Sequence, residues 1–148
     1  MDMEFENLTE VPLPDYKEMI RLKTAVLVGA ALQMGAVVAQ ADEATQKALY
    51  DFGLCIGVAF QLQDDYLDSF GNEERFGKRI GGDILEGKKT YLYIKAIENA
   101  TEQQRALLLK TFDDKNLPDE KKIGIVQQIY VQTQAEQFLL KDIEQYTQ

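Results

Sequence analysis

The pattern of apolar and polar residues along the chain predicts helices from one end to the other. Apolar positions recur at helical spacing after Pro14, and the following run from Ala25 to Ala41 is apolar nearly all round. That run predicts a buried helix packed closely on its neighbours. A second long helix is predicted from Asp42 to about Ser69, because two acids at its start suit the positive end of a helix dipole.

The second half of the chain shows the same helical spacing in shorter segments. Helices are predicted over 90–98 and 101–112, and a further one begins at Pro118, with a covering helix over 121–145 that has one polar face. No segment alternates apolar and polar residues as a strand does. The sequence therefore predicts an all-α fold, with residues 1–148 in one domain.

Three local features refine the helix predictions. Pro14 is expected to lie before its helix, with Asp15 as the capping residue. Gly53 and Gly57 lie four residues apart and would let another helix approach closely. The single cysteine, Cys55, lies within an apolar run and is expected to be a small buried hydrophobic residue.

The end of the second long helix carries an unusual stripe of acids. Gln61, Asp64, Asp65 and Asp68 fall within about 100° of the helix circumference. They lie near the negative end of the helix dipole, where each acid is disfavoured by roughly 0.3–1 kcal/mol. No lysine or arginine occurs between Lys47 and Arg75 to offset them. A cation from outside is the expected partner, and Mg²⁺ suits clustered carboxylates whose shell is completed by water and phosphate.

The segment after these acids supplies groups that bind anions. It reads FGNEERFGKRIGGDILEGKKT from Phe70 to Thr90, and its five glycines predict a loop. Backbone N–H groups and lysines in such a loop can approach a phosphate. The stripe and the loop together suggest a diphosphate held through metal on one side and by lysine on the other.

The order of these motifs resembles the second aspartate-rich region of the trans-isoprenyl diphosphate synthases, also called polyprenyl synthetases. The motifs are FQ at 60–61, DDxxD at 64–68, GK at 77–78, GGDI at 81–84 and GKKT at 87–90. Upstream, Lys23-Thr24 resembles the KT motif of the family, although a lysine in apolar surroundings can also reach outward to water. The resemblance implies the C-terminal part of an isoprenoid-synthase helical bundle.

The resemblance also implies a reaction and roles for the matching residues. The reaction is head-to-tail condensation of an allylic diphosphate with isopentenyl diphosphate, with Mg²⁺ as cofactor. Lys23 and Lys78 would bind the diphosphate directly, with Lys88 as a third lysine, while Thr24 and Gln61 would place oxygens toward the developing cation. Phe60 would pack against the isopentenyl tail. Asp64 and Asp68 would hold Mg²⁺, and Asp65 would either bind the ion or lie directly behind its ligands.

The chain also departs from the family pattern. No DDxxD motif precedes the one at 64–68, and Asp2 resembles the end of a GQxxD motif whose first residues are absent. We therefore expect residues 1–148 to be a C-terminal portion that is inactive by itself, from a protein that is a homodimer at full length. The alternatives are a non-catalytic helical subunit or regulator of a prenyl diphosphate synthase, and a plain interaction module with a solvated acidic face.

Composition excludes other classes of function. Histidine is absent, which excludes His-ligated zinc and His-based catalytic triads, and the net charge of −9 argues against nucleic acid as a partner. The mean hydropathy is −0.29, and the apolar run Ala25–Ala41 falls short of the ~20 residues that span a membrane. With one cysteine and no leader-like start, the sequence predicts a cytoplasmic protein without a membrane span.

Overall fold

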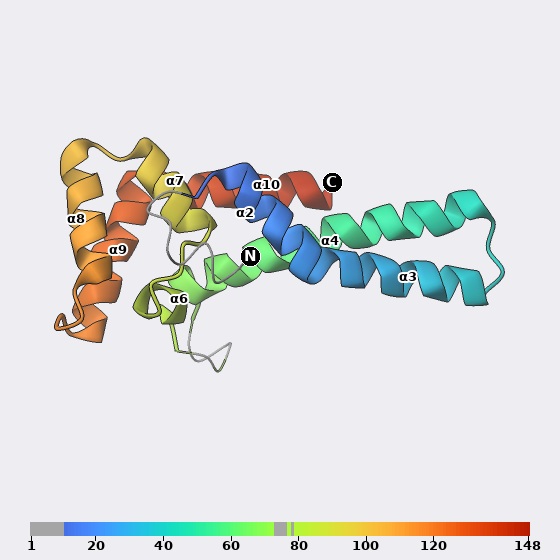
Figure 1. Ribbon diagram of the computed structural model, residues 1–148, viewed down its shortest axis with the longest axis horizontal. Coiled ribbons are helices and arrows are strands. Elements are labelled where there is room, and N and C mark those ends of the chain that lie inside the picture. Colours follow the sequence, from blue (N-terminus) through green and yellow to red (C-terminus); the bar gives the residue numbers. More distant parts are fainter. Residues whose placement is uncertain (1–10, 73–76, 78) are drawn as a thin grey trace.

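The computed structural model describes residues 11–72, 77 and 79–148, and all regular structure in these residues is helical. The predicted all-α fold is confirmed. Figure 1 shows α3 and the first half of α4 as an extended hairpin, with α8 and α9 at the opposite end of the molecule. The elements are α2 (Leu13–Ile20), η1 (Arg21–Ala25), α3 (Val26–Val38), α4 (Glu43–Phe70), α6 (Gly82–Leu85), α7 (Tyr91–Asn99), α8 (Glu102–Asp113), α9 (Asp119–Gln132) and α10 (Ala135–Thr147).

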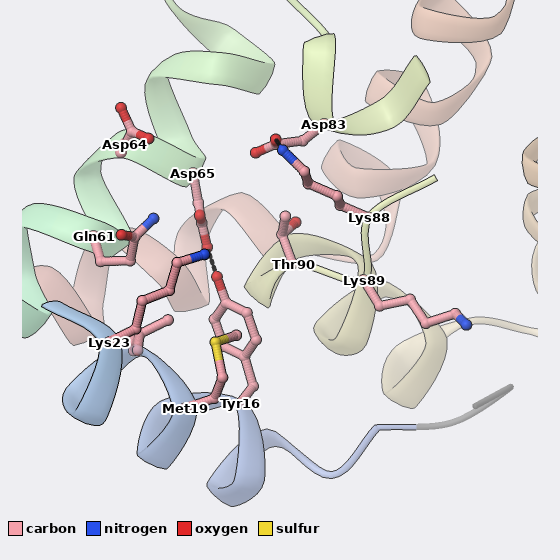
Figure 2. Close-up of a pocket in the computed structure, with 11 residues that line it drawn as sticks. Tyr16, Met19, Lys23, Gln61, Asp64, Asp65, Asp83, Lys88, Lys89 and Thr90 are labelled. Carbon is pink, nitrogen blue, oxygen red and sulfur yellow. Dashed lines mark hydrogen bonds and ion pairs between the residues drawn. The ribbon is translucent and has the colours of Figure 1, made fainter. Parts of the chain in front are cut away.

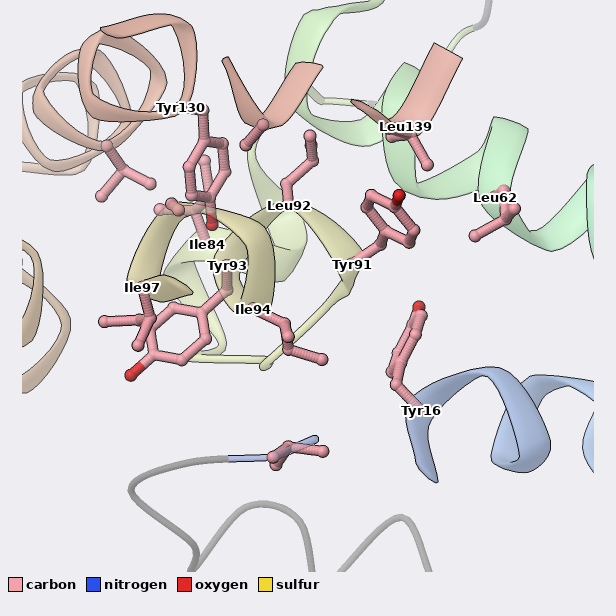
Figure 3. Close-up of a cluster of buried hydrophobic side chains, with 14 of the residues drawn as sticks. Tyr16, Leu62, Ile84, Tyr91, Leu92, Tyr93, Ile94, Ile97, Tyr130 and Leu139 are labelled. Carbon is pink, nitrogen blue, oxygen red and sulfur yellow. The ribbon is translucent and has the colours of Figure 1, made fainter. Parts of the chain in front are cut away.

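The core is built around α7, a short helix that is apolar on most of its circumference. Six of its nine residues are buried: Tyr91, Leu92, Tyr93, Ile94, Ala96 and Ile97. Figure 3 shows these side chains among residues from α2, α4, α9 and α10. A helix that is hydrophobic nearly all round is buried by its neighbours. Residues of α2, α4, α9 and α10 therefore surround α7 in the core.

The helix starts show two side-chain caps, and they test the cap predicted at Asp15. Asp42 caps α4, because its side chain accepts from the backbone N–H of Thr45, and Thr101 and Gln104 form a reciprocal capping box at α8. The predicted cap at Asp15 is wrong. The helix α2 begins at Leu13 with Pro14 in its first turn and no side-chain cap. A proline fits there because the first N–H groups of a helix lack partners within it.

The predicted 121–145 helix is two helices. The first of them, α9, ends at Gln132, and Gln134, just before α10, adopts a left-handed backbone with φ of 61°. The hydroxyl of Thr133 donates to the carbonyl of Ile129, within the last turn of α9. Helical spacing continues across the break, so the pattern alone did not reveal it.

The close approach predicted at the glycines of α4 is confirmed, but the predicted burial around it is wrong. A Cβ built on Gly53 would lie 2.5 Å from the Cα of Gly29, and one built on Gly57 would lie 2.5 Å from the Cα of Ala25. Only Gly29 and Ala36 of α3 are buried, and Cys55 is exposed. The hairpin buries one face of each helix, so the opposite faces remain open.

The helical stretch Leu13–Val38, which runs without interruption through α2, η1 and α3, is long and apolar enough to cross a membrane. Its apolar window is 22% buried in the fold. Core helices of soluble proteins meet the same criteria of length and composition, so the stretch does not by itself assign a membrane.

Candidate functional site

A cavity of about 330 Å³ lies where three parts of the chain meet: the α2–η1 segment, the second half of α4 and the residues before α7 (Figure 2). Polar and charged side chains from all three parts line it. They are Tyr16, Lys23, Gln61, Asp64, Asp65, Asp83, Lys88, Lys89 and Thr90. The fold thus brings together the KT motif, the acidic stripe and the GKKT motif, which the sequence places up to 67 residues apart.

The KT motif lies in η1, a π-helical turn inside an otherwise α-helical stretch. Such turns admit an extra residue and are frequent at functional sites. The hydroxyl of Thr24 donates to Oε1 of Gln61 at 3.2 Å, so the motif is joined to α4 directly. Lys23 lines the cavity, and Figure 2 shows its side chain reaching toward Gln61 and Asp65. The lysine therefore faces a polar cavity between helices.

Asp65 is buried, with 3% exposure, and is held by several donors. The phenol of Tyr16 and the side chain of Gln61 hydrogen-bond its carboxylate, as does the backbone N–H of Tyr91. Burial raises the pKa of Asp65 to about 7, although the hydrogen bond from Tyr16 acts in the opposite direction. Burial, together with the neighbouring charge of Asp65, raises the pKa of Tyr16. Asp65 therefore joins α4 to α2 and to the start of α7.

The other two acids of the stripe face a second cavity of about 320 Å³ beside the first. Asp64 is exposed and lines both cavities. Asp68 accepts a hydrogen bond from the backbone N–H of Asp83 at 3.0 Å, and partial burial raises its pKa. The two cavities share Asp64, Asp83 and Lys88 as lining residues.

Lys88 brings a cation to the boundary between the cavities. Its ammonium lies 2.9 Å from Asp83 and 2.7 Å from Glu86. The hydrogen bonds to Glu86 and Asp83 raise the pKa of Lys88, so it stays protonated at neutral pH. Because both partners are partly exposed, these pairs contribute little to stability and can open for an incoming anion.

Two predicted site residues that the structure describes, Thr24 and Phe60, line neither cavity. Phe60 is 67% exposed. It lies on the open face of α4, so its predicted contact with substrate stays a prediction. Lys78 and Asp2 lie outside the described residues.

Sequence reasoning missed Tyr16, Asp83 and Lys89 as lining residues. Asp83 and Lys89 stand inside the GGDI and GKKT motifs, so the motifs themselves carried the signal. Figure 2 shows the amine of Lys89 directed away from Lys23 and Asp65. Tyr16 carried no local signal, because its role depends on contact with a residue 49 positions away.

The carboxylates are compatible with Mg²⁺ bound jointly by protein and substrate. No group of three or more metal-binding side chains lies close together in the described part of the chain. Mg²⁺ needs no such group, because it is commonly held by one or two carboxylates with water and substrate phosphates. Asp64 and Asp68 can supply those carboxylates, and the nearby lysines suit the phosphates.

The fold and the cavity define an all-helical protein whose site combines carboxylates and lysines in the way that suits a metal-bound phosphate. The family model described as polyprenyl synthetase matches residues 1–131. The chain therefore belongs to the polyprenyl synthetase family, as the motifs predicted.

Curated relatives bear synthase names. The chain is 46% identical over 109 residues to a short chain isoprenyl diphosphate synthase of Methanothermobacter thermautotrophicus, covering 74% of this chain and 34% of that protein. It is 40% identical over 120 residues to a geranylgeranyl diphosphate synthase of Saccharolobus solfataricus, covering 81% and 36%. The chain thus spans about a third of the length of these relatives.

Solved structures give the same fold. A crystal structure of a geranylgeranyl pyrophosphate synthase matches with a TM-score of 0.90 and 47% identity, covering 99% of this chain and 46% of that one. A geranylgeranyl pyrophosphate synthase from Corynebacterium glutamicum, in complex with isoprenyl diphosphate and magnesium, matches with a TM-score of 0.88 and 29% identity, covering 99% and 42%.

Proposed function

We propose that this chain is part of an isoprenyl diphosphate synthase, a prenyltransferase that condenses an allylic diphosphate with isopentenyl diphosphate using Mg²⁺. The observation that supports the proposal best is the cavity that gathers Lys23, Gln61, Asp64 and Lys88 from three separate segments. Membership of the family and the names of the relatives agree with it.

The reaction places two demands on such a site. The C–O bond of the allylic diphosphate breaks, the double bond of isopentenyl diphosphate forms a new C–C bond with the resulting cation, and a proton leaves the adduct. The site must stabilise the departing diphosphate and keep water from the cation. Bound Mg²⁺ supplies charge neutralisation for the leaving group.

The residues of this chain divide these tasks between them. Asp64 and Asp68 hold the metal, and the ammonium groups of Lys23 and Lys88 bind diphosphate oxygens. The hydroxyl of Thr24 donates a hydrogen bond to Gln61. The lone pairs of the Thr24 oxygen therefore stay available to face positive charge. Lys78, outside the described residues, would add a third cation.

We further propose that residues 1–148 bind diphosphate but do not catalyse the condensation alone. The chain carries one DDxxD motif, at 64–68, whereas the resemblance implies an earlier one as well in a complete synthase. At full length the protein would be a cytoplasmic homodimer. Turnover of allylic and isopentenyl diphosphates by purified residues 1–148 with Mg²⁺ would overturn the claim of inactivity.

Calorimetric titration with inorganic pyrophosphate, with and without Mg²⁺, tests whether residues 1–148 form a half-site, that is, the part of the diphosphate site that Lys23, Asp64, Asp68 and Lys88 supply. We expect Mg²⁺-dependent binding that Asp64→Ala weakens by about tenfold or more, since one carboxylate ligand is lost. Asp51→Ala is the matched control, because Asp51 is an exposed acid on the same helix and lies outside both cavities.

Two results would count against the half-site. Binding that is indifferent to Mg²⁺ and to Asp64→Ala would remove the role assigned to Asp64. Absence of pyrophosphate binding under every condition would show that residues 1–148 do not form a working half-site.

A further inference from the structure

Two carboxylates on different helices each join α2 to α7, and they do so through neighbouring residues. Asp65 of α4 accepts from the phenol of Tyr16 and from the backbone N–H of Tyr91. Asp142 of α10 accepts from the hydroxyl of Tyr91 at 2.9 Å and pairs with the ammonium of Lys17 at 2.5 Å. Tyr91 is thus held by its backbone on one side and by its side chain on the other.

The contacts of Asp142 lie in a partly enclosed setting, where they are stronger than surface pairs. Tyr91 is 1% exposed, and the side chains of Asp142 and Lys17 are 18% and 29% exposed. The ammonium of Lys17 also lies 5.9 Å from the ring centre of Tyr91 and 5.7 Å from that of Tyr146. Charge-assisted hydrogen bonds and cation–π contacts gain strength when water is excluded.

Tyr91 is the first residue of α7, directly after the residues that line the candidate site. The segment 88–90 is not helical, so its position depends on what fixes its two ends. At one end, the backbone N–H of Lys88 donates to the carbonyl of Asp83 at 2.9 Å. At the other end, Thr90 precedes α7 without a side-chain cap, and Tyr91 is the anchor.

We propose that Asp142, which lines neither cavity, is a positioning residue that fixes the segment 88–90 through the hydroxyl of Tyr91. Its contact with Lys17 holds α2 against the same carboxylate, and α2 continues into η1, which carries Lys23. The segment with Lys88 and the helix with Lys23 are therefore fixed relative to each other. The use of this arrangement in diphosphate binding rests on the proposed function.

Backbone amide exchange in the ligand-free chain tests the anchor without any ligand. In Asp142→Asn we expect the Tyr91 amide to exchange about tenfold faster, as in a local opening, while amides of α8 and α9 keep their wild-type rates. Tyr91→Phe, which removes only the hydroxyl, should give the same local effect. Glu144→Gln, an exposed acid on the same helix, is the matched control and should change nothing.

The outcomes of the exchange experiment are distinct. Faster exchange confined to the start of α7 supports the anchor. Unchanged exchange at Tyr91, or an equal increase throughout α7, α8 and α9, overturns it, because the second pattern is that of a general loss of stability.

Pyrophosphate titration with Mg²⁺ then tests whether the anchor serves the site. We expect Asp142→Asn and Tyr91→Phe each to weaken binding by about fivefold, and the double variant to be no weaker than either, because coupled residues are not additive. Losses of affinity that add up in the double variant would overturn the positioning role. Wild-type affinity in Asp142→Asn, despite faster amide exchange at Tyr91, would overturn it as well. A wild-type chain that binds no pyrophosphate would instead refute the proposed function, with the exchange result still deciding the anchor.

Discussion

At the scale of single residues, lysines with similar sequence surroundings have different structural roles. Lys122 is 7% exposed, and its ammonium donates to the carbonyls of Phe112 at 2.9 Å and Asp114 at 3.4 Å. These carbonyls belong to the end of α8, where the last turn has no N–H partners within the helix. Lys122 therefore caps α8 from α9, whereas its neighbour Lys121 is exposed.

Lys122→Met should lower the free energy of unfolding by about 1–3 kcal/mol, because the variant keeps the apolar stem but leaves partly buried carbonyls without their donor. Urea denaturation followed by circular dichroism measures the change. Lys121→Met is the matched control and should stay within about 0.5 kcal/mol of the wild type. Equal stability of the two variants would contradict the capping role.

At the scale of elements, the close packing of α3 on α4 depends on glycines, which have no side chain at the contact. Gly53 faces Gly29 so closely that a methyl group would meet backbone atoms, which cannot turn aside as a side chain can. The same contact brings the start of α3, and with it the KT motif, against the helix that carries the acids. Close helix packing and site geometry are therefore coupled.

Gly53→Ala should destabilise the chain by about 1–3 kcal/mol through overpacking. Gly35→Ala is a control in the partner helix, since a Cβ there meets nothing within 4 Å. It should stabilise by roughly 0.5–1 kcal/mol, as alanine does when it replaces glycine inside a helix. Thermal or urea unfolding that moves both variants in the same direction would contradict the close-approach argument.

At the scale of the whole molecule, the α3–α4 hairpin exposes a large apolar surface. Leu27, Met34, Val37 and Val38 of α3 are all more than half exposed. Phe52 and Phe60 of α4 are 55% and 67% exposed. Exposed apolar surface promotes association in water.

We expect purified residues 1–148 to self-associate as concentration rises, which sedimentation velocity measures directly. The double variant Leu27→Lys/Val38→Lys should shift the chain toward monomer, because it places charge on residues that are 72% and 84% exposed without altering the core. A wild-type chain that stays monomeric across the concentration series would contradict this prediction.

The sequence alone determined the all-α fold, most helix starts and several of the residues that line the candidate site. These features are local: helical spacing, the helix starts at Asp42 and Thr101, and motifs such as DDxxD and GKKT can be read within a few residues. The family followed from the order of the motifs, and the family model confirms it.

Tertiary structure decided the features that depend on contacts between distant residues. Asp65 has the same local sequence signal as Asp64, yet only Asp65 is buried against Tyr16 and the start of α7. The burial predicted for α3 and Cys55 was wrong because apolar composition favours burial only where another element supplies the covering face. Helical spacing likewise continues through Gln134, whose left-handed backbone separates α9 from α10 in the structure.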